Sequence, residues 1–162
     1  MKTYLKLTSK ILVSDTDISR VLAYYRFRDF KIVFTNGCFD ILHRGHVDYL
    51  AKAADLGDIL IIGLNTDDSV KRLKGENRPI FDQDSRAIML AALSFVNNII
   101  FFEEDTPIEL IEIVKPDILV KGADYNEQNI VGADFVKQYG GSVKTIELTP
   151  GFSTTNIISK LK

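Results

Sequence analysis

Residues 58–64 form a nearly continuous apolar run, Asp-Ile-Leu-Ile-Ile-Gly-Leu, in which only the first residue is charged. A strand with one face in water would alternate apolar and polar side chains, so this run indicates a strand that is buried on both faces. Such strands occur almost only in parallel sheets that are covered by helices on both sides. This run alone therefore favours an α/β fold.

Further buried strands alternate with helical patterns along the chain. The expected strands are residues 31–34, 58–64, 98–102, 118–120 and 142–148. The expected helices are residues 43–57, 69–73, 85–93, 106–114, 130–139 and 156–161. Thr106 is expected to be the N-cap of the fourth helix, with Pro107 at its first position, and Gly57 to end the first. Together these elements predict a doubly wound, five-stranded parallel sheet with helices on both faces.

Residues 1–30 stand apart from this alternation. Residues 15–29 could form one amphipathic helix, with Ile18, Val21, Leu22 and Tyr25 on its apolar face. We interpret the segment as a helical appendage that packs on the domain formed by residues 31–162.

Composition excludes several classes of protein. A chain of 162 residues with 46% hydrophobic residues suits one domain with a real core, and a net charge of -2 argues against non-specific nucleic-acid binding. No apolar run approaches membrane-spanning length, and residues 1–5 lack a signal-peptide core. The single cysteine, Cys38, excludes an internal disulfide. We expect a cytoplasmic protein with no nucleic-acid or membrane partner.

Residues 35–46, Thr-Asn-Gly-Cys-Phe-Asp-Ile-Leu-His-Arg-Gly-His, carry the strongest functional signal. They lead from the first expected strand of the domain through a glycine turn into a helix, and ligands in such sheets bind beyond the carboxyl ends of strands. A helix start offers unpaired N–H groups to an anion, and His43 and His46 share a face there because they are three residues apart. Two imidazoles at such a place can stabilise charge on a phosphate or a departing pyrophosphate, which indicates nucleotide chemistry.

Two motifs carry a family resemblance. Residues 37–46 resemble the HxGH signature of the cytidylyltransferase-like nucleotidyltransferases, and residues 151–155, Gly-Phe-Ser-Thr-Thr, resemble their second motif. Within that superfamily, several stretches are similar to the D-glycero-β-D-manno-heptose 1-phosphate adenylyltransferases: residues 71–75, 78–80, 104–107, 116–125 and 155–158. The similarity runs from about Lys31 to Lys160.

The resemblance implies a Rossmann-like fold of the nucleotidyltransferase α/β superfamily, with residues 31–162 as the nucleotidyltransferase domain. It also implies transfer of AMP from ATP to D-glycero-D-manno-heptose 1-phosphate, which yields ADP-heptose and pyrophosphate, with Mg²⁺ bound to the triphosphate. Two anionic reactants must meet in line, so such a site needs cations and N–H donors. Because this domain is one half of a longer chain in relatives that are fused to a sugar kinase, we expect the kinase step to come from another protein.

Position and resemblance together give the expected site. Catalytic roles are expected for His43, His46, Arg86 and Lys121. Nucleotide binding is expected at Thr35, Asn36, Gly37, Cys38, Phe39, Asp40, Gly45, Lys121, Gly122, Asp124, Ser153, Thr154 and Thr155. Sugar-phosphate binding is expected at Asp67, Lys71, Arg72, Lys74 and Arg78, and no metal ligand is expected among the side chains.

Several of these residues have structural alternatives. Asp40 fits a helix cap that orients a histidine, and Arg86 fits a structural ion pair. Cys38 fits a small buried residue better than a nucleophile. The basic cluster of residues 71–78 fits a solvated face, and residues 153–155 fit a simple N-cap, which uses the same donors as phosphate binding.

Other functions remain open at this point. The main rival is a cytidylyltransferase that uses CTP and glycerol 3-phosphate or another alditol phosphate. That resemblance calls for a basic residue at the position of Asp48 and an arginine at the position of Leu148. Because both are missing, the sequence favours the adenylyltransferase hypothesis. A non-catalytic nucleotide-binding module is a further alternative. The chain lacks the G-x-G-x-x-G of dinucleotide-binding oxidoreductases and the lysine-rich second signature of tRNA synthetases. Residues 88–96 are apolar and favour a homodimer.

Overall fold

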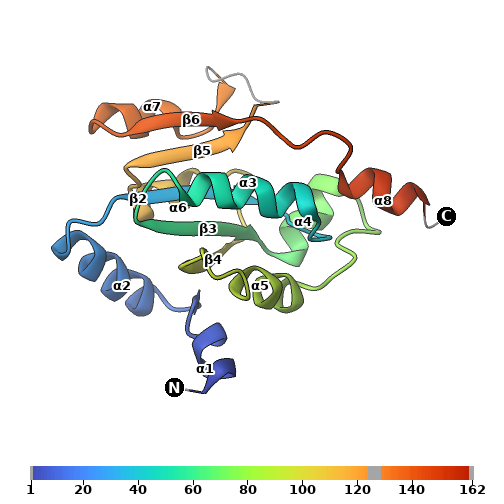
Figure 1. Cartoon of the computed structure of the whole chain (residues 1–162), viewed down its shortest axis with the longest axis horizontal. Helices are drawn as coiled ribbons and strands as arrows, with labels where there is room; N and C mark the ends of the chain where they lie inside the picture. Colours follow the sequence, from blue (N-terminus) through green and yellow to red (C-terminus); the bar gives the residue numbers. More distant parts are fainter. Residues whose placement is uncertain (1, 124–128, 161–162) are drawn as a thin grey trace.

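Six parallel strands form one sheet at the centre of the molecule (Figure 1). This computed structural model describes residues 2–123 and 129–160, with only the backbone of residues 155, 156 and 160. The strands are β1 (Ile11–Leu12), β2 (Ile32–Gly37), β3 (Ile59–Asn65), β4 (Asn98–Phe102), β5 (Ile118–Gly122) and β6 (Ser142–Ile146). Their order across the sheet is β1-β4-β3-β2-β5-β6, and every neighbouring pair is parallel. The expected doubly wound α/β class is confirmed.

Helices connect the strands and cover both faces of the sheet. They are α1 (Thr3–Thr8), α2 (Asp15–Phe27), α3 (Arg44–Ala54), α4 (Asp67–Lys74), α5 (Gln83–Ala91), α6 (Ile108–Val114), α7 (Ala133–Gln138) and α8 (Thr154–Lys160). Polar side chains start several of them: Ser14, Thr66 and Asp82 accept a hydrogen bond from the N–H group three residues further on. Such caps satisfy donors that have no partner within the helix.

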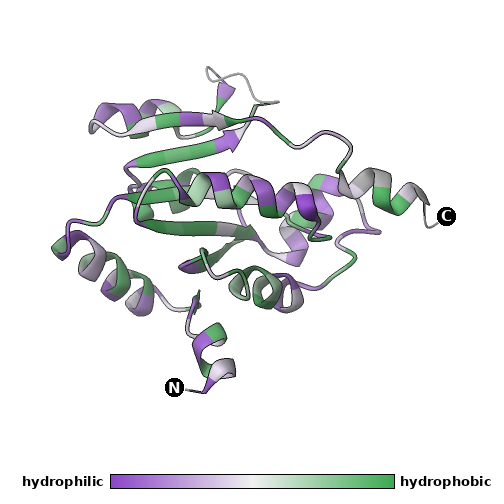
Figure 2. Ribbon diagram, in the orientation of Figure 1, coloured by the Kyte–Doolittle hydropathy of each residue, from purple (hydrophilic) through white to green (hydrophobic). Residues whose placement is uncertain are grey.

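The core consists of two apolar layers, one on each face of the sheet. Along β2, Ile32 and Phe34 point into a cluster with residues of α2, α6 and α7, whereas Val33 points into a cluster with residues of α3 and α5. Every residue of β3 is buried, as the apolar run at 58–64 predicts. Figure 2 shows hydrophobic central strands and helices that carry both hydrophobic and hydrophilic residues.

The chain reverses its direction of travel across the sheet at β2. From β2 it moves outward through β3 to β4, and then returns to the other side of β2 to form β5 and β6. The carboxyl ends of β2 and β5 therefore lie at a topological switch point, where doubly wound sheets bind ligands. The loops that follow these two strands, residues 38–43 and the segment after Gly122, both contain expected site residues.

Some local expectations differ from the structure. The sheet has one strand more than expected, because Ile11 and Leu12 of the N-terminal segment pair with β4. A two-residue strand is too short to produce a periodic pattern. The prediction that Thr106 caps α6 is wrong: Pro107 occupies the cap position, where its carbonyl accepts from the Ile111 N–H at 2.9 Å and no side chain caps the helix.

The end of α3 also differs from the sequence expectation. The helix ends at Ala54, and Gly57 lies in the turn that leads to β3. A Cβ at Gly57 would lie 2.6 Å from the Lys31 carbonyl oxygen, so this glycine allows close approach of two backbones. Within residues 2–123 and 129–160, no helix has the length and apolar character that crossing a bilayer requires.

Candidate active site

Two histidines stand at the beginning of α3. His43 is the N-cap residue rather than part of the first turn: its backbone is extended, and its Nδ1 accepts a hydrogen bond from the His46 backbone N–H at 3.3 Å. The two imidazole rings stack with their centroids 3.8 Å apart and their planes 16° apart. The expected pairing of the two side chains is therefore present, and it is set by a helix cap.

Gly45 makes this stack possible. A Cβ at this position would lie 2.9 Å from the Phe152 Cβ and 3.1 Å from two atoms of the His43 ring. Contacts this short are not tolerated without movement, so any side chain here would push the imidazole or Phe152 away. The glycine in the His43-x-Gly45-His46 pattern thus has a steric role.

Both imidazoles favour the neutral form. Burial and the neighbouring His43 lower the pKa of His46 from 6.5 to about 4, and burial also lowers the pKa of His43. Phe39 covers His46 edge-on with ring centroids 5.2 Å apart, and the buried Nδ1 of His46 has no hydrogen-bond partner among the described residues. At neutral pH the pair can thus act as neutral hydrogen-bond donors and acceptors.

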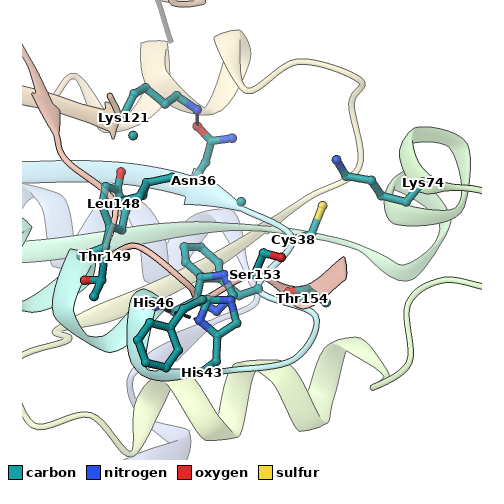
Figure 3. Close-up of a pocket in the computed structure, with 16 residues that line it drawn as sticks. Asn36, Cys38, His43, His46, Lys74, Lys121, Leu148, Thr149, Ser153 and Thr154 are labelled. Carbon is teal, nitrogen blue, oxygen red and sulfur yellow. Dashed lines mark hydrogen bonds between the residues drawn. The ribbon is translucent and has the colours of Figure 1, made fainter. Parts of the chain in front are cut away.

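Lys121 and Asn36 mark the switch point between the two central strands. Lys121 comes from the end of β5 and is 9% exposed, and its Nζ donates to the Asn36 side-chain oxygen at the end of β2. Figure 3 shows this pair across the pocket from His43 and His46. The arrangement sets one ammonium group opposite two imidazoles.

These groups line a cavity of about 390 Å³. Its walls come from the ends of β2 and β5, the start of α3, the end of α4 and the segment that leads into α8. They comprise Asn36, Gly37, Cys38, Phe39, His43, Gly45, His46, Tyr49, Lys74, Lys121, Gly122, Leu148, Thr149, Phe152, Ser153 and Thr154. Most of the expected nucleotide-binding residues therefore meet in one place, including the Ser153 and Thr154 of the second motif.

The segment before α8 is held against α3. The Thr149 hydroxyl donates to the Asp48 carboxylate at 3.0 Å, and Arg44 lies over the Phe152 ring at 5.7 Å from its centroid. Phe152 in turn faces the His43 ring with centroids 6.4 Å apart. These contacts bring the second motif beside the two histidines, although more than a hundred residues of sequence separate them.

A second cavity, of about 440 Å³, adjoins the first. It shares Asn36, Gly37, Cys38, Phe39, His46, Lys74, Lys121 and Thr154 with the first cavity, and adds Asp40, Asn65, Leu73, Arg78, Phe102 and Asp105. Burial raises the pKa of the Cys38 thiol on the shared wall, against the opposing pull of nearby cations such as Lys74. Cys38 therefore favours the neutral thiol, in keeping with a small packing residue.

Asp40 lies at the second cavity and holds a loop. Its carboxylate accepts from Arg78 Nε and from the backbone N–H groups of Ile80 at 2.7 Å and Phe81 at 3.1 Å. The alternative that Asp40 caps the helix or orients a histidine is wrong, because His43 is the cap and the Asp40 oxygens are bound to the loop.

Arg86 does not reach either cavity. It is fully buried, and its guanidinium donates to the carbonyls of Phe81, Cys38 and Asn65 at 3.0, 2.7 and 2.9 Å and to the Asp67 carboxylate at 2.7 Å. The structural ion pair is the alternative that this geometry supports, for Arg86 and for Asp67 alike.

Three other expected residues also do not line the two cavities. The hydroxyl of the fully buried Thr35 bonds to that of Tyr49 at 2.7 Å, so Thr35 supports a wall residue rather than lining the wall. Lys71 pairs with Asp68 at 3.1 Å on the surface. Arg72 pairs with Asp105 at 3.0 Å in a shallow hollow apart from the histidines. Of the basic cluster, only Lys74 and Arg78 line the two cavities.

The side chains of two expected site residues are not among those that the structure describes. In addition, some residues that line the first cavity were not expected from the sequence. Asp124 is outside the described residues, as is the side chain of Thr155. Tyr49, Thr149 and Phe152 line the first cavity but were not named as site residues. Tyr49 follows His46 by three residues on α3, so helical spacing alone could have found it. Among the described residues, no group of three His, Cys, Asp or Glu side chains is arranged to hold a metal ion.

Comparisons with known proteins agree with this geometry. A family model described as cytidylyltransferase-like matches residues 34–160. The bifunctional protein HldE of Syntrophotalea carbinolica is 52% identical over 157 residues, which are 97% of this chain and 32% of that protein. HldE of Campylobacter jejuni subsp. jejuni serotype O:2 is 60% identical over 132 residues, covering 82% of this chain and 28% of that protein. The chain thus spans about a third of the length of these curated relatives.

Solved structures give the same result. A lipopolysaccharide core biosynthesis protein from Thermoplasma volcanium is similar with a TM-score of 0.61 and 33% identity, covering 74% of this chain and 97% of that one. A pantoate-beta-alanine ligase from Francisella tularensis has a TM-score of 0.62 over 91% of this chain and 76% of that one, at 16% identity, which is a likeness of fold alone. The matched motifs, the fold and the relatives agree: this chain belongs to the cytidylyltransferase-like family.

Proposed function

We propose that this chain is a nucleotidyltransferase that transfers AMP from ATP to D-glycero-D-manno-heptose 1-phosphate, giving ADP-heptose and pyrophosphate. The observation that carries the proposal is the meeting of His43, His46, Lys121, Ser153 and Thr154 around one cavity at the switch point of the sheet. All of these groups can donate hydrogen bonds to phosphate oxygens. A reaction between two anions needs such donors, because they offset the repulsion between the reactants.

The proposed reaction is an in-line displacement. A phosphate oxygen of the sugar phosphate forms a bond to the α-phosphorus of ATP, while the bond from the α-phosphorus to the bridging oxygen breaks and the electron pair leaves with pyrophosphate. Positioning and electrostatic stabilisation carry phosphoryl-type transfer, so no covalent enzyme intermediate is needed. We assign His43 and His46 to the α-phosphate and the departing pyrophosphate, and Lys121 to the charge on the α-phosphate.

The remaining assignments follow the walls of the cavities. Nucleotide binding is proposed for the lining residues Asn36, Gly37, Cys38, Phe39, Gly45, Gly122, Ser153 and Thr154. Asp124 and Thr155 stay in the proposal from the sequence alone. Lys74 and Arg78 are proposed to bind the sugar phosphate, whereas Arg86, Asp67, Lys71, Arg72 and Thr35 are not retained as ligands, because their contacts are with the protein or the solvent.

Mg²⁺ enters this proposal as part of the substrate. Magnesium commonly keeps several waters and binds through substrate phosphates with one or two carboxylates. Its charge would offset part of the repulsion between the two reactants.

The choice of ATP over CTP rests on the relatives and on two positions beside the cavity. The HldE proteins are 52–60% identical to this chain, and the Thermoplasma protein is named for lipopolysaccharide core biosynthesis, in agreement with a sugar-nucleotide product. The resemblance to the rival cytidylyltransferases calls for a basic residue at the position of Asp48 and an arginine at the position of Leu148. In this structure Asp48 binds Thr149 and Leu148 lines the cavity.

Organisation and surroundings belong to the proposal as well. We assign the transferase activity to residues 31–162, with residues 1–30 packed on it, and a cytoplasmic location without nucleic-acid or membrane partners. The homodimer stays a prediction. Within residues 88–96, which favoured it, Leu90, Ala91 and Val96 are buried in the chain's own core.

A substrate matrix tests the proposal. Purified protein is mixed with Mg²⁺, with ATP or CTP, and with heptose 1-phosphate or glycerol 3-phosphate, and pyrophosphate release is followed. We expect turnover with ATP and heptose 1-phosphate. Turnover with CTP and glycerol 3-phosphate alone would support the rival, and nucleotide binding without any turnover would support a binding module.

A further inference from the structure

Asp40 is a buried carboxylate that touches neither histidine. Its side chain is 1% exposed, yet it lines the wall of the second cavity. Burying a carboxylate is costly unless charge and hydrogen bonds compensate for it. Here the compensation comes from a single loop, which supplies the Arg78 guanidinium and two backbone N–H groups at residues 80 and 81.

This anchoring fixes where Arg78 points. The guanidinium is bound to Asp40 through Nε, and among the described residues its two terminal nitrogens make no hydrogen bond or ion pair. Arg78 lines the second cavity, and its side chain is 19% exposed. A guanidinium held by one edge keeps its other donors directed outward, which suits binding of a planar, charged group such as phosphate.

The second cavity has an excess of positive charge. Arg78, Lys74 and Lys121 line it, together with Asp40 and Asp105. Asp40 is bound to Arg78, and Asp105 is bound to Arg72, which does not line this cavity. Lys74 has no ion-pair partner among the described residues, and Figure 3 shows it extending from α4 toward Cys38. Its charge is thus available to an anionic ligand.

The two cavities meet where the transfer would take place. Their common wall contains His46, Lys121 and Thr154, which the proposed function assigns to the nucleotide. A ligand in the second cavity would therefore face the α-phosphate from the side that lacks His43, Tyr49 and Phe152. In-line transfer needs this opposed placement of two reactants. The apolar side chains of Leu73 and Phe102 add a surface for the carbon skeleton of a sugar.

We propose that Asp40 is a positioning residue for the acceptor: it folds residues 78–81 back so that Arg78, with Lys74, holds the phosphate of a phosphorylated sugar in the second cavity. This inference rests on the proposed function and assigns a place to its second substrate. Asp40 acts through Arg78 and contacts neither reactant. Its effect therefore falls on the acceptor and leaves binding of the nucleotide, which occupies the first cavity, intact.

A double-mutant cycle tests this coupling. KM for ATP and KM for heptose 1-phosphate are measured for wild type, Asp40→Asn, Arg78→Gln and the double variant. Asp40→Asn removes the charge and turns an amide N–H₂ group toward loop donors. We expect each single variant to raise KM for heptose 1-phosphate by at least about tenfold and to leave KM for ATP within about twofold. Because both changes disrupt the same contact between Arg78 and the acceptor, the double variant is expected to have the same KM for heptose 1-phosphate as Arg78→Gln alone.

A matched control comes from the same loop. Glu76→Gln also removes one negative charge, but Glu76 is exposed and makes no hydrogen bond to another described residue. We expect this variant to keep both KM values. Thermal unfolding of each variant shows whether the fold is retained, and Arg78→Gln carries the test if Asp40→Asn does not fold, since Arg78 is partly exposed at the cavity wall.

The outcomes separate this inference from the proposed function. A wild-type protein that releases no pyrophosphate from ATP and heptose 1-phosphate overturns both. An active wild type whose Asp40→Asn and Arg78→Gln variants raise KM for ATP, or raise neither KM, overturns the inference alone. Additive effects in the double variant also overturn it, since they indicate that Asp40 does not act through Arg78. A rise confined to the sugar phosphate, without additivity, supports it.

Discussion

The imidazole of His46 lies 3.8 Å from that of His43, nearly parallel to it, and each ring depends on the other for its place. The cap hydrogen bond from the His46 N–H to His43 Nδ1 fixes the first ring, and the first ring together with Phe39 covers the second. Such preorganised donors stabilise charge that develops in a transition state without reorganising at that moment.

Replacement of His46 tests the catalytic assignment. We expect His46→Asn to lower kcat by about 10²–10³-fold, the cost of losing one well-placed donor, while KM for both substrates changes little. Initial rates of pyrophosphate release measure this. Lys52→Gln, an exposed change on the same helix, is the control and should keep the wild-type rate. A His46→Asn variant with wild-type kcat would remove His46 from the reaction.

The histidine pair also predicts how stability depends on pH. The pKa of His46 is lowered to about 4 in the folded state, so the unfolded chain binds a proton more readily. The contribution of neutral His46 to the free energy of unfolding should therefore be fully present above about pH 6.5. It should be lost as the pH falls from there toward 4. A shift of this size corresponds to a loss on the order of 3 kcal/mol.

Urea unfolding at a series of pH values measures this dependence, with His46→Asn as the comparison. The variant should show a shallower loss between pH 6.5 and 4, because it lacks the titrating group. Equal slopes for both proteins would show that His46 is not the group responsible. The same pKa predicts that His46 of the free enzyme does not titrate near neutrality, so it should contribute no step to kcat/KM between pH 6 and 8.

Gly45→Ala tests the steric role of the signature glycine. The new methyl group would collide with the His43 ring and with Phe152, so we expect both to move away from the cavity. A displacement of about 1 Å in a catalytic group costs on the order of 10²-fold in rate. Steady-state kinetics give the rate, and circular dichroism shows whether the overall helical content is retained. Wild-type turnover by this variant would mean that the stack is not needed.

Arg86→Ala separates a structural role from a catalytic one. This change leaves Asp67 and three carbonyl groups without their donor, and breaking a buried ion pair costs about 3–5 kcal/mol. Chemical denaturation should show this loss. The exposed Arg72→Ala should stay within about 0.5 kcal/mol of wild type. If Arg86→Ala keeps wild-type stability and loses only activity, the catalytic expectation from the sequence was right.

The fold was largely predictable because its strands are buried on both faces. In β3 every position is apolar except its last, so the run stands out without any knowledge of its neighbours. That His43 and His46 lie together was predictable from their spacing of three residues at a helix start, whereas the N-cap position of His43, outside the first turn, was not. Strand β1 was not predictable, because two residues that pair with β4 carry no periodicity.

The roles of the charged residues depended on contacts that the sequence does not contain. Arg86 binds carbonyls of Cys38 and Asn65, which come from two other strand ends, so only the folded chain shows that its donors are used. Lys71 and Lys74 belong to one basic run on α4, but only Lys74 lines the cavities. The role of Asp40 depends on the backbone N–H groups of Ile80 and Phe81, which lie about forty residues further along the chain and donate to its carboxylate.

Phosphorus NMR of one competition mixture tests the central claim most directly. The mixture contains the protein, Mg²⁺, equal amounts of ATP and CTP, and equal amounts of heptose 1-phosphate and glycerol 3-phosphate. The proposed function predicts that ADP-heptose and pyrophosphate appear at equal rates while the CTP and glycerol 3-phosphate signals persist. Growth of a CDP-linked product with ATP unchanged, or no new diphosphate signal at all, would contradict it.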